Sequence, residues 1–121
     1  MLFDTTQAAL EATIAGASAR QTALACNLAN ANTPGYQRVD VDFHSSLAAA
    51  LSGDEGSAAE RLHGMSFAPQ ADASGAVRAD GSTVDVDSES AKLAANALEH
   101  QAAVQVAHAR IGILKSAMGV S

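Results

Sequence analysis

The chain has 121 residues, a length that allows one domain and makes a second unexpected. Half of its apolar residues are alanine, and Leu, Ile, Val and Phe together number only 24, too few for the roomy core of an enzyme. The formal charge of −6 argues against nucleic acid and anionic membranes as partners, because few cations are present to contact phosphates. No apolar run is long enough for a transmembrane helix, and the basic start of a cleavable signal peptide is missing.

The charged residues divide the chain into three regions. Residues 1–38 carry equal numbers of acids and bases, residues 39–90 carry a net charge of −8, and residues 91–121 carry +2. Alanine favours helices and lets them approach closely, so the composition predicts thin helices that need partners. We predict a mainly α fold with a first helix and its exit over 1–38, a variable loop and short-strand region over 39–86, and a last helix over 87–121.

The first helix is predicted from its start and stop signals and is roughly 26 residues long. Asp4 is a suitable N-cap, and Pro34 with Gly35 ends the helix. Its apolar residues recur with the spacing of a heptad repeat, and two glutamines fill positions of the same stripe. This first stripe comprises Phe3, Leu10, Ile14, Ala17, Leu24, Leu28 and Ala31, with Gln7 and Gln21 between them.

The last helix shows the same kind of pattern. Asp87 is its predicted N-cap, Lys115 lies near its last turn, and Gly119 can close its C-terminus. Its apolar residues again follow a heptad spacing, which His100 interrupts. This last stripe comprises Leu93, Ala97, Val104, Ala107, Ile111, Leu114 and Met118. Both stripes are therefore predicted to be packing surfaces.

Between the helices, residues 52–83 are rich in Gly, Ser and Asp and are predicted to form a loop with, at most, short extended pieces. The tetrapeptide Val-Asp-Val-Asp occurs at 39–42 and again at 84–87, and its alternation predicts two short strands that flank the loop. Whether these strands pair with each other stays open.

The groups that could carry chemistry do not form a recognisable site. The four histidines lack the spacing of a zinc site, four aspartates lack the pattern of a calcium loop, and the single cysteine has no basic neighbour to activate it. These groups are His44, His63, His100 and His108; Asp40, Asp42, Asp85 and Asp87; and Cys26. Polar helix faces, strand edges and helix caps account for them, so we expect no metal, no cofactor and no enzymatic activity.

The most informative segment is the exit of the first helix, residues 27–36, with the sequence Asn-Leu-Ala-Asn-Ala-Asn-Thr-Pro-Gly-Tyr. The residue before a proline is pushed toward an extended backbone, and Pro34-Gly35 fits the centre of a type II turn. Tyr36 offers a ring that can pack back on the helix end. A simple helix stop explains the proline and the glycine, but it leaves the asparagine series unexplained.

This segment resembles the signature of the bacterial flagellar rod and hook protein family, in which Asn-x-Ala-Asn-x-x-Thr-Pro-Gly-Tyr closes an amphipathic N-terminal helix. The matching residues are Asn27, Ala29, Asn30, Thr33, Pro34, Gly35 and Tyr36. Residues 38–43 and the approach to the last helix, residues 80–87, are similar to the short members that form the proximal rod. Where relatives usually carry an aromatic residue, this chain has His100.

The resemblance implies a structural protein. In this family the N- and C-terminal helices pair as a coiled coil and stack with neighbouring subunits in a helical rod that transmits torque from the motor. It further implies export through the flagellar type III apparatus without a cleaved signal, a place in the periplasmic part of the basal body, and contacts with other rod proteins and with the MS ring and export gate. The small number of large apolar residues predicts a subunit that gains order when neighbouring subunits bury its stripes. The residues alone leave a second possibility open, a soluble helical-hairpin adaptor or chaperone-like binding protein.

Overall fold

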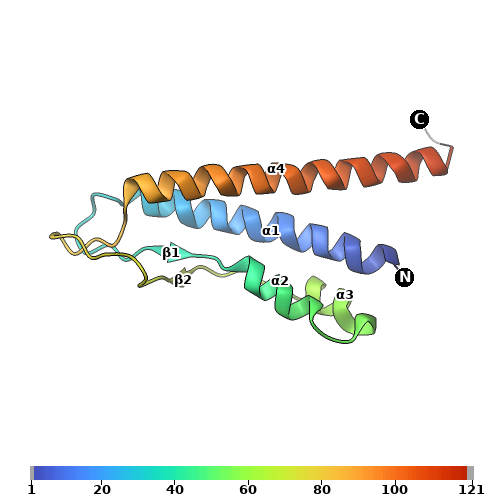
Figure 1. The fold of residues 1–121 in the computed structure, drawn as a ribbon, viewed down its shortest axis with the longest axis horizontal. Coiled ribbons are helices and arrows are strands. Elements are labelled where there is room, and N and C mark those ends of the chain that lie inside the picture. Colours follow the sequence, from blue (N-terminus) through green and yellow to red (C-terminus); the bar gives the residue numbers. More distant parts are fainter. Residues whose placement is uncertain (1, 120–121) are drawn as a thin grey trace.

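The structure, a computed structural model, describes residues 2–119, without the side chains of residues 2–4 and 55. Two long helices dominate it: α1 spans Leu2–Ala29 and α4 spans Val86–Ala117. They lie side by side and run in opposite directions along an elongated molecule (Figure 1). This arrangement confirms the predicted, mainly α fold with long terminal helices. Within residues 2–119, no helix has both the length and the apolar composition that crossing a membrane requires.

Helix α1 is the middle layer of the fold. On one side it packs against α4, and on another it packs against two short helices, α2 (Phe43–Leu51) and α3 (Glu55–His63) (Figure 1). Alanines on α1 let the short helices approach closely. The buried residues of this contact are Ala8, Ala12, Ala50 and Leu62, and a second cluster contains Ala17, Ala23, Val41 and Phe43.

Gly16 allows Phe43, the first residue of α2, to lie directly on α1. A Cβ atom at position 16 would come within 2.6 Å of the Phe43 Cβ, well inside the distance of normal contact between carbon atoms. Phe43 is completely buried. The rings of Phe43 and Phe67 meet edge to face, with their centroids 6.5 Å apart. A glycine that weakens the helix locally therefore makes room for a large core side chain.

The middle region contains more regular structure than the sequence predicts. The 52–83 segment includes α3 and the strand β2 (Gln70–Ala71), which pairs antiparallel with β1 (Val39–Asp40). The prediction of a strand at 84–87 is wrong, because Asp85 caps α4 and the chain turns into the helix there. Helices α2 and α3 have only nine residues each, too few to give a clear periodic signal, and packing on α1 stabilises them.

The ends of α4 differ in detail from the prediction. Asp85, and not Asp87, is the N-cap: its side chain accepts hydrogen bonds from the backbone amides of Asp87 and Ser88. At the other end Met118 is the C-cap, and Gly119 follows it with a φ of +73°. That left-handed geometry is the one in which glycine commonly ends a helix.

The first stripe lies in the packed part of α1. The helix begins at Leu2, so the predicted cap Asp4 lies inside it, and the side chains of Asp4 and Phe3 are outside the described residues. Ala17, Leu24 and Ala31 are buried, and Leu10, Ile14, Gln7, Gln21 and Leu28 are half-buried. The heptad spacing thus selects residues that are covered in the folded chain.

Helix α4 turns a different row toward α1 than its heptad spacing predicts. Its buried residues are Glu89, Asn96 and Ala103. Asn96 donates from Nδ2 to the Ala17 carbonyl and to Oε1 of Gln21, each at 2.8 Å. The predicted last stripe lies beside this row: Leu93, Val104 and Ala107 are half-buried, as is His100, and Ala97, Ile111, Leu114 and Met118 are exposed.

Candidate functional site

The motif segment ends α1 in a tight turn. The Tyr36 amide donates to the Thr33 carbonyl at 3.2 Å, and Gly35 between them has a φ of +74°. This is the turn that Pro34-Gly35 predicts, and its positive φ favours glycine. The Gly35 amide also donates to the Asp80 carbonyl at 2.9 Å. The exit of α1 and the loop before α4 therefore lie together.

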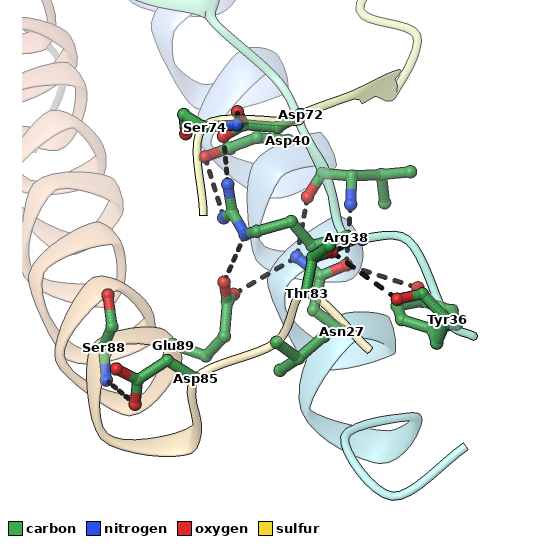
Figure 2. Close-up of polar contacts among 12 residues, drawn as sticks. Asn27, Tyr36, Arg38, Asp40, Asp72, Ser74, Thr83, Asp85, Ser88 and Glu89 are labelled. Carbon is green, nitrogen blue, oxygen red and sulfur yellow. Dashed lines mark hydrogen bonds and ion pairs between the residues drawn. The ribbon is translucent and has the colours of Figure 1, made fainter. Parts of the chain in front are cut away.

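Asn27, near the end of α1, is completely buried at the centre of a polar cluster (Figure 2). Its side chain binds both backbone groups of Val39: Nδ2 donates to the carbonyl at 2.6 Å, and Oδ1 accepts from the amide at 2.9 Å. The Tyr36 hydroxyl donates to Oδ1 at 3.2 Å, and Nδ2 also donates to Glu89 at 3.2 Å. One side chain thus joins α1, its exit and the start of α4.

Arg38 and Glu89 form a buried ion pair. Their side chains are 3% and 1% exposed, and Nε of Arg38 lies 2.6 Å from Oε1 of Glu89. The guanidinium also contacts Asp40 at 3.3 Å and Asp72, and the Arg38 amide donates to the Thr83 hydroxyl at 2.8 Å. Buried charges are tolerated when they are paired and hydrogen-bonded, and both charges meet that condition here (Figure 2).

These contacts join four segments of the chain: the end of α1, the segment that follows it, the loop before α4 and the first turns of α4. We call the set formed by Asn27, Tyr36, Arg38, Thr83 and Glu89 the clasp. In the described part of the chain, the one buried side-chain oxygen or nitrogen without a hydrogen-bond partner is Oδ1 of Asn96, which is not in the clasp. Among the described side chains no three His, Cys, Asp or Glu residues are grouped to hold a metal ion. The buried polar atoms of the clasp hydrogen-bond with one another and with the backbone of neighbouring segments.

The electrostatics favour the charged forms of Arg38 and of its neighbour Asp40. Burial opposes the charge on Arg38, but the hydrogen bonds and negative charges of Glu89 and Asp40 raise its pKa. Burial would by itself raise the pKa of Asp40, yet hydrogen bonds from Arg20, at 2.9 Å, and from the Val41 amide hold that pKa below its usual value. Both groups remain ionised at neutral pH.

Tyr36 keeps its proton. Burial raises the pKa of its hydroxyl, and the nearby Cys26 and Glu89 raise it further because a negative charge on the tyrosine would be repelled. The hydroxyl therefore stays a donor, which is the role that its contact with Asn27 requires.

The remaining motif residues make local contacts or face solvent. Asn30 donates from Nδ2 to the Cys26 carbonyl at 2.9 Å and accepts from the Thr33 hydroxyl at 3.2 Å, which closes the helix end. The exposed members are Ala29, Thr33, Pro34 and Gly35. Of the motif residues, Asn27 and Tyr36 are the two that take part in the clasp.

Arg38, Thr83 and Glu89 are clasp residues that the sequence analysis does not single out. By its position Glu89 is an acid in the first turn of α4, where the helix dipole favours it in any case. An arginine two residues after the motif is a usable signal, since a cation that becomes buried needs an anionic partner. Residues 39–90 contain ten acids, however, and only the fold selects Glu89 among them.

Comparison with known proteins gives consistent matches. Residues 5–37 match the family described as flagella basal body rod protein. The flagellar basal body rod protein FlgB of Aeromonas hydrophila is 33% identical over 112 residues, covering 84% of this chain and 84% of that protein. FlgB of Salmonella typhimurium is 39% identical over 101 residues (72% and 73%), and FlgB of Escherichia coli is 33% identical over 115 residues (84% and 81%).

These similarities extend well beyond the N-terminal motif. They cover most of this chain and most of each relative, so they include much more than the helix exit. They also favour the rod protein over the helical-hairpin adaptor, which the residues alone leave open. The chain therefore belongs to the FlgB family of flagellar basal-body rod proteins.

Proposed function

We propose that this chain is a structural subunit of the proximal rod of the bacterial flagellum, where it assembles with other rod proteins and helps to transmit torque. The observation that carries this proposal is an apolar row on the surface of α4, which we call the outer stripe. Its members are Ala91, Ala95, Leu98, Ala102, Val106, Ala109, Ile113 and Ala117, and all eight are exposed.

The outer stripe is continuous along the helix. Its members are three or four residues apart, the spacing that keeps side chains on one helix face. The repeat from Ala91 to Ala102 to Ile113 is eleven residues, close to three turns, so the stripe stays nearly parallel to the helix axis. Leu98, Val106 and Ile113 are 69%, 50% and 68% exposed. A long apolar surface of this kind is typical of a contact with another protein.

The clasp controls which side of α4 becomes the outer face. Glu89 belongs to the buried row that faces α1, and its ion pair with Arg38 holds the first turns of α4 in one rotation. The outer stripe lies on a different face of the helix, so this rotation leaves it exposed. We infer that the motif and the clasp prepare an assembly surface.

The place of the subunit within the basal body is inferred from the family relationship. We infer that the subunit lies in the periplasmic part of the basal body, next to the MS ring and export gate, after export by the flagellar type III apparatus without a cleaved signal. Other rod proteins are its partners. The length of the outer stripe supports several such contacts along one helix. Ile111, Leu114 and Met118 of the last stripe are also exposed, on a different face of the helix from the outer stripe, and offer a second apolar surface.

The test places a charge on the outer stripe. Leu98→Glu and Ile113→Glu should leave the fold intact, since both side chains face solvent. They should prevent incorporation into the rod, because an unpaired charge buried in a contact is strongly unfavourable. His108→Glu adds a charge at an exposed position of α4 that is not three or four residues from any member of the outer stripe, and this variant should assemble normally.

Each variant would be quantified in purified basal bodies, and the circular dichroism of the purified chain would establish that its helices are intact. Recovery of both stripe variants at the normal level would contradict the proposed use of the outer stripe. Absence of the unaltered chain from basal bodies would contradict the proposed function itself.

A further inference from the structure

We propose that residues 45–66, which we call the lobe, form a hinged cover that opens from α1 as a unit while the two long helices and the clasp stay folded. The lobe contains most of α2, all of α3 and the turn after α3. It packs on α1 along a different side from α4 (Figure 1). This inference goes beyond the proposed function, because it concerns the free subunit before any neighbour binds.

The contact between the lobe and α1 is apolar. Among the described residues, no hydrogen bond or ion pair joins the lobe to α1. Three of the four residues buried in this contact are alanines, and the set is Ala8, Ala12, Ala50 and Leu62. Burial stabilises in proportion to the apolar area removed from water, and alanine contributes a single methyl group. The contact that closes the lobe is therefore weak for its length.

The clasp is held by a different kind of contact. There the Arg38–Glu89 ion pair is buried, and Asn27 hydrogen-bonds to Glu89 and to the backbone of Val39. Separating such groups leaves buried charges and polar atoms without partners, which is strongly unfavourable. Opening the lobe breaks none of these contacts, so it requires less free energy than opening the clasp.

Both ends of the lobe are anchored at one place, which serves as the hinge. At the start, Phe43 is buried against Gly16. His44 stacks on the Phe43 ring and binds Glu99 of α4, with Nε2 2.6 Å from Oε1. At the end, Phe67 meets the ring of Phe43 edge to face. Two anchors side by side let the segment between them swing without moving the rest of the chain.

The two helices of the lobe are tied to each other. Arg61 of α3 donates from Nε to the carbonyl of Ala50 in α2 at 2.9 Å, and from Nη2 to the carbonyl of Asp54 between the helices at 3.2 Å. Because these bonds lie within the lobe, α2 and α3 move together. When they move, they uncover the face of α1 that carries Ala8 and Ala12, which is buried in the closed subunit.

The experiment measures how fast single cysteines react with a maleimide in the purified full chain. Ala12→Cys and Ala50→Cys probe the two sides of the lobe contact, and Ala103→Cys probes the contact between the long helices. Each is made together with Cys26→Ser, and the native Cys26, which is exposed, gives the rate of an open thiol.

The thiols at positions 12 and 50 should have the same opening constant and should react at least about tenfold faster than the thiol at position 103, because opening of the lobe requires less free energy than separation of the long helices. Their rates should depend only weakly on urea, since opening the lobe exposes little surface.

Two leucine-to-alanine changes form a matched pair. Leu62→Ala weakens the lobe contact and should raise the rates at positions 12 and 50 by about tenfold or more, without changing the rate at position 103. Leu24→Ala removes a completely buried leucine of α1 outside that contact. It should raise the rate at position 103, with little effect at positions 12 and 50.

Equal rates and equal urea dependence at the three positions would overturn the proposal, because global unfolding alone would then expose the lobe contact. A fast reaction at position 12 with a slow one at position 50 would also overturn it, since α1 would then open by itself. Hydrogen exchange of the unaltered chain checks the result without cysteine variants. Amides of residues 47–63 should share one free energy of opening, lower than that of the amides around Asn96, and an equal or higher value would contradict the hinged cover.

Discussion

At the scale of single residues, the Asn27 side chain hydrogen-bonds the backbone of Val39 in the way that a residue of a neighbouring strand would. A side-chain amide presents one acceptor and one donor in a plane, as a peptide group does, and Asn27 uses both on the backbone of Val39. Alanine offers neither group, and aspartate offers no donor for the Val39 carbonyl or for Glu89. The requirement at this position is therefore for an amide, which explains one member of the asparagine series that a helix stop does not.

Replacing Asn27 with alanine should destabilise the fold strongly. The Val39 backbone and Glu89 would each lose a buried partner, at a cost of about 1–3 kcal/mol for each unsatisfied group. Asn32→Ala changes the same residue type at an exposed position and should alter the free energy of unfolding by less than about 0.5 kcal/mol. Urea unfolding followed by circular dichroism compares the two, and equal midpoints would contradict the central role of Asn27.

Two glycines in the long helices should respond in opposite directions to alanine. At Gly16 the added Cβ would overlap Phe43, so Gly16→Ala should cost about 1–3 kcal/mol through overpacking. At Gly112 nothing lies within 4 Å of the added Cβ, so Gly112→Ala should stabilise the helix by about 1 kcal/mol at most. Thermal unfolding of both variants tests this. A similar shift in the same direction would mean that Phe43 does not pack closely on α1.

At the scale of elements, β1 is held in place by charges more than by strand pairing. It has two residues and pairs with an equally short β2, a ladder too small to be stable alone. Asp40 in β1 instead binds Arg20 of α1 and the buried Arg38. Asp72, directly after β2, binds the same guanidinium. Ion pairs thus attach the short sheet to the helices.

This attachment predicts acid sensitivity. Although burial opposes it, hydrogen bonds from Arg20 and the Val41 amide lower the pKa of Asp40 below its usual 3.8. A carboxyl whose pKa is lower in the folded state contributes stability that is complete above the unfolded pKa and is lost as the pH falls through the folded pKa. The stabilising contribution of Asp40 should therefore disappear as the pH falls below 3.8.

Asp40→Asn provides the measurement, because asparagine resembles the protonated acid. At about pH 7 the variant should unfold at lower urea concentration than the parent chain, and the difference should vanish once the pH lies well below the folded pKa. A difference that stays constant over this range would show that the charge of Asp40 does not attach β1.

At the scale of the whole molecule, packing is concentrated on α1 and is absent at one end of α4. Helix α1 lies between α4 and the α2–α3 pair, whereas the last turns of α4, residues 111–117, which we call the overhang, are exposed and continue past the start of α1 (Figure 1). The composition predicts a subunit that is ordered only in part until neighbours cover it. The structure indicates where the order should be lowest, because a helix without tertiary packing is only marginally stable in water.

Hydrogen exchange of the isolated subunit should therefore be uneven along α4. Amides of residues 111–117 should exchange fast, and those around Asn96 and Ala103 should be protected, since these residues are buried against the rest of the fold. In purified basal bodies the overhang should become protected as well. Uniform protection along α4 in the free subunit would contradict the expectation that the overhang needs a partner.

The sequence by itself determined the features that depend on residues close together in the chain. The Pro34-Gly35 turn, the two long helices and the covered first stripe all follow from helix propensity, turn chemistry and heptad spacing. The motif at the helix exit was sufficient to indicate the rod protein family. These signals act over a few residues, so they can be seen without the fold.

Only the tertiary structure decided the pairings between distant segments. Arg38 binds Glu89, 51 residues away, and β1 pairs with β2 instead of residues 84–87. It also decided the rotation of α4, which turns Glu89, Asn96 and Ala103 inward and leaves the outer stripe exposed. An alanine-rich helix has apolar residues on several faces, so hydrophobicity alone cannot select one. The buried polar groups select the face that turns inward, because each of them needs a hydrogen-bond or ion-pair partner that only the whole fold supplies.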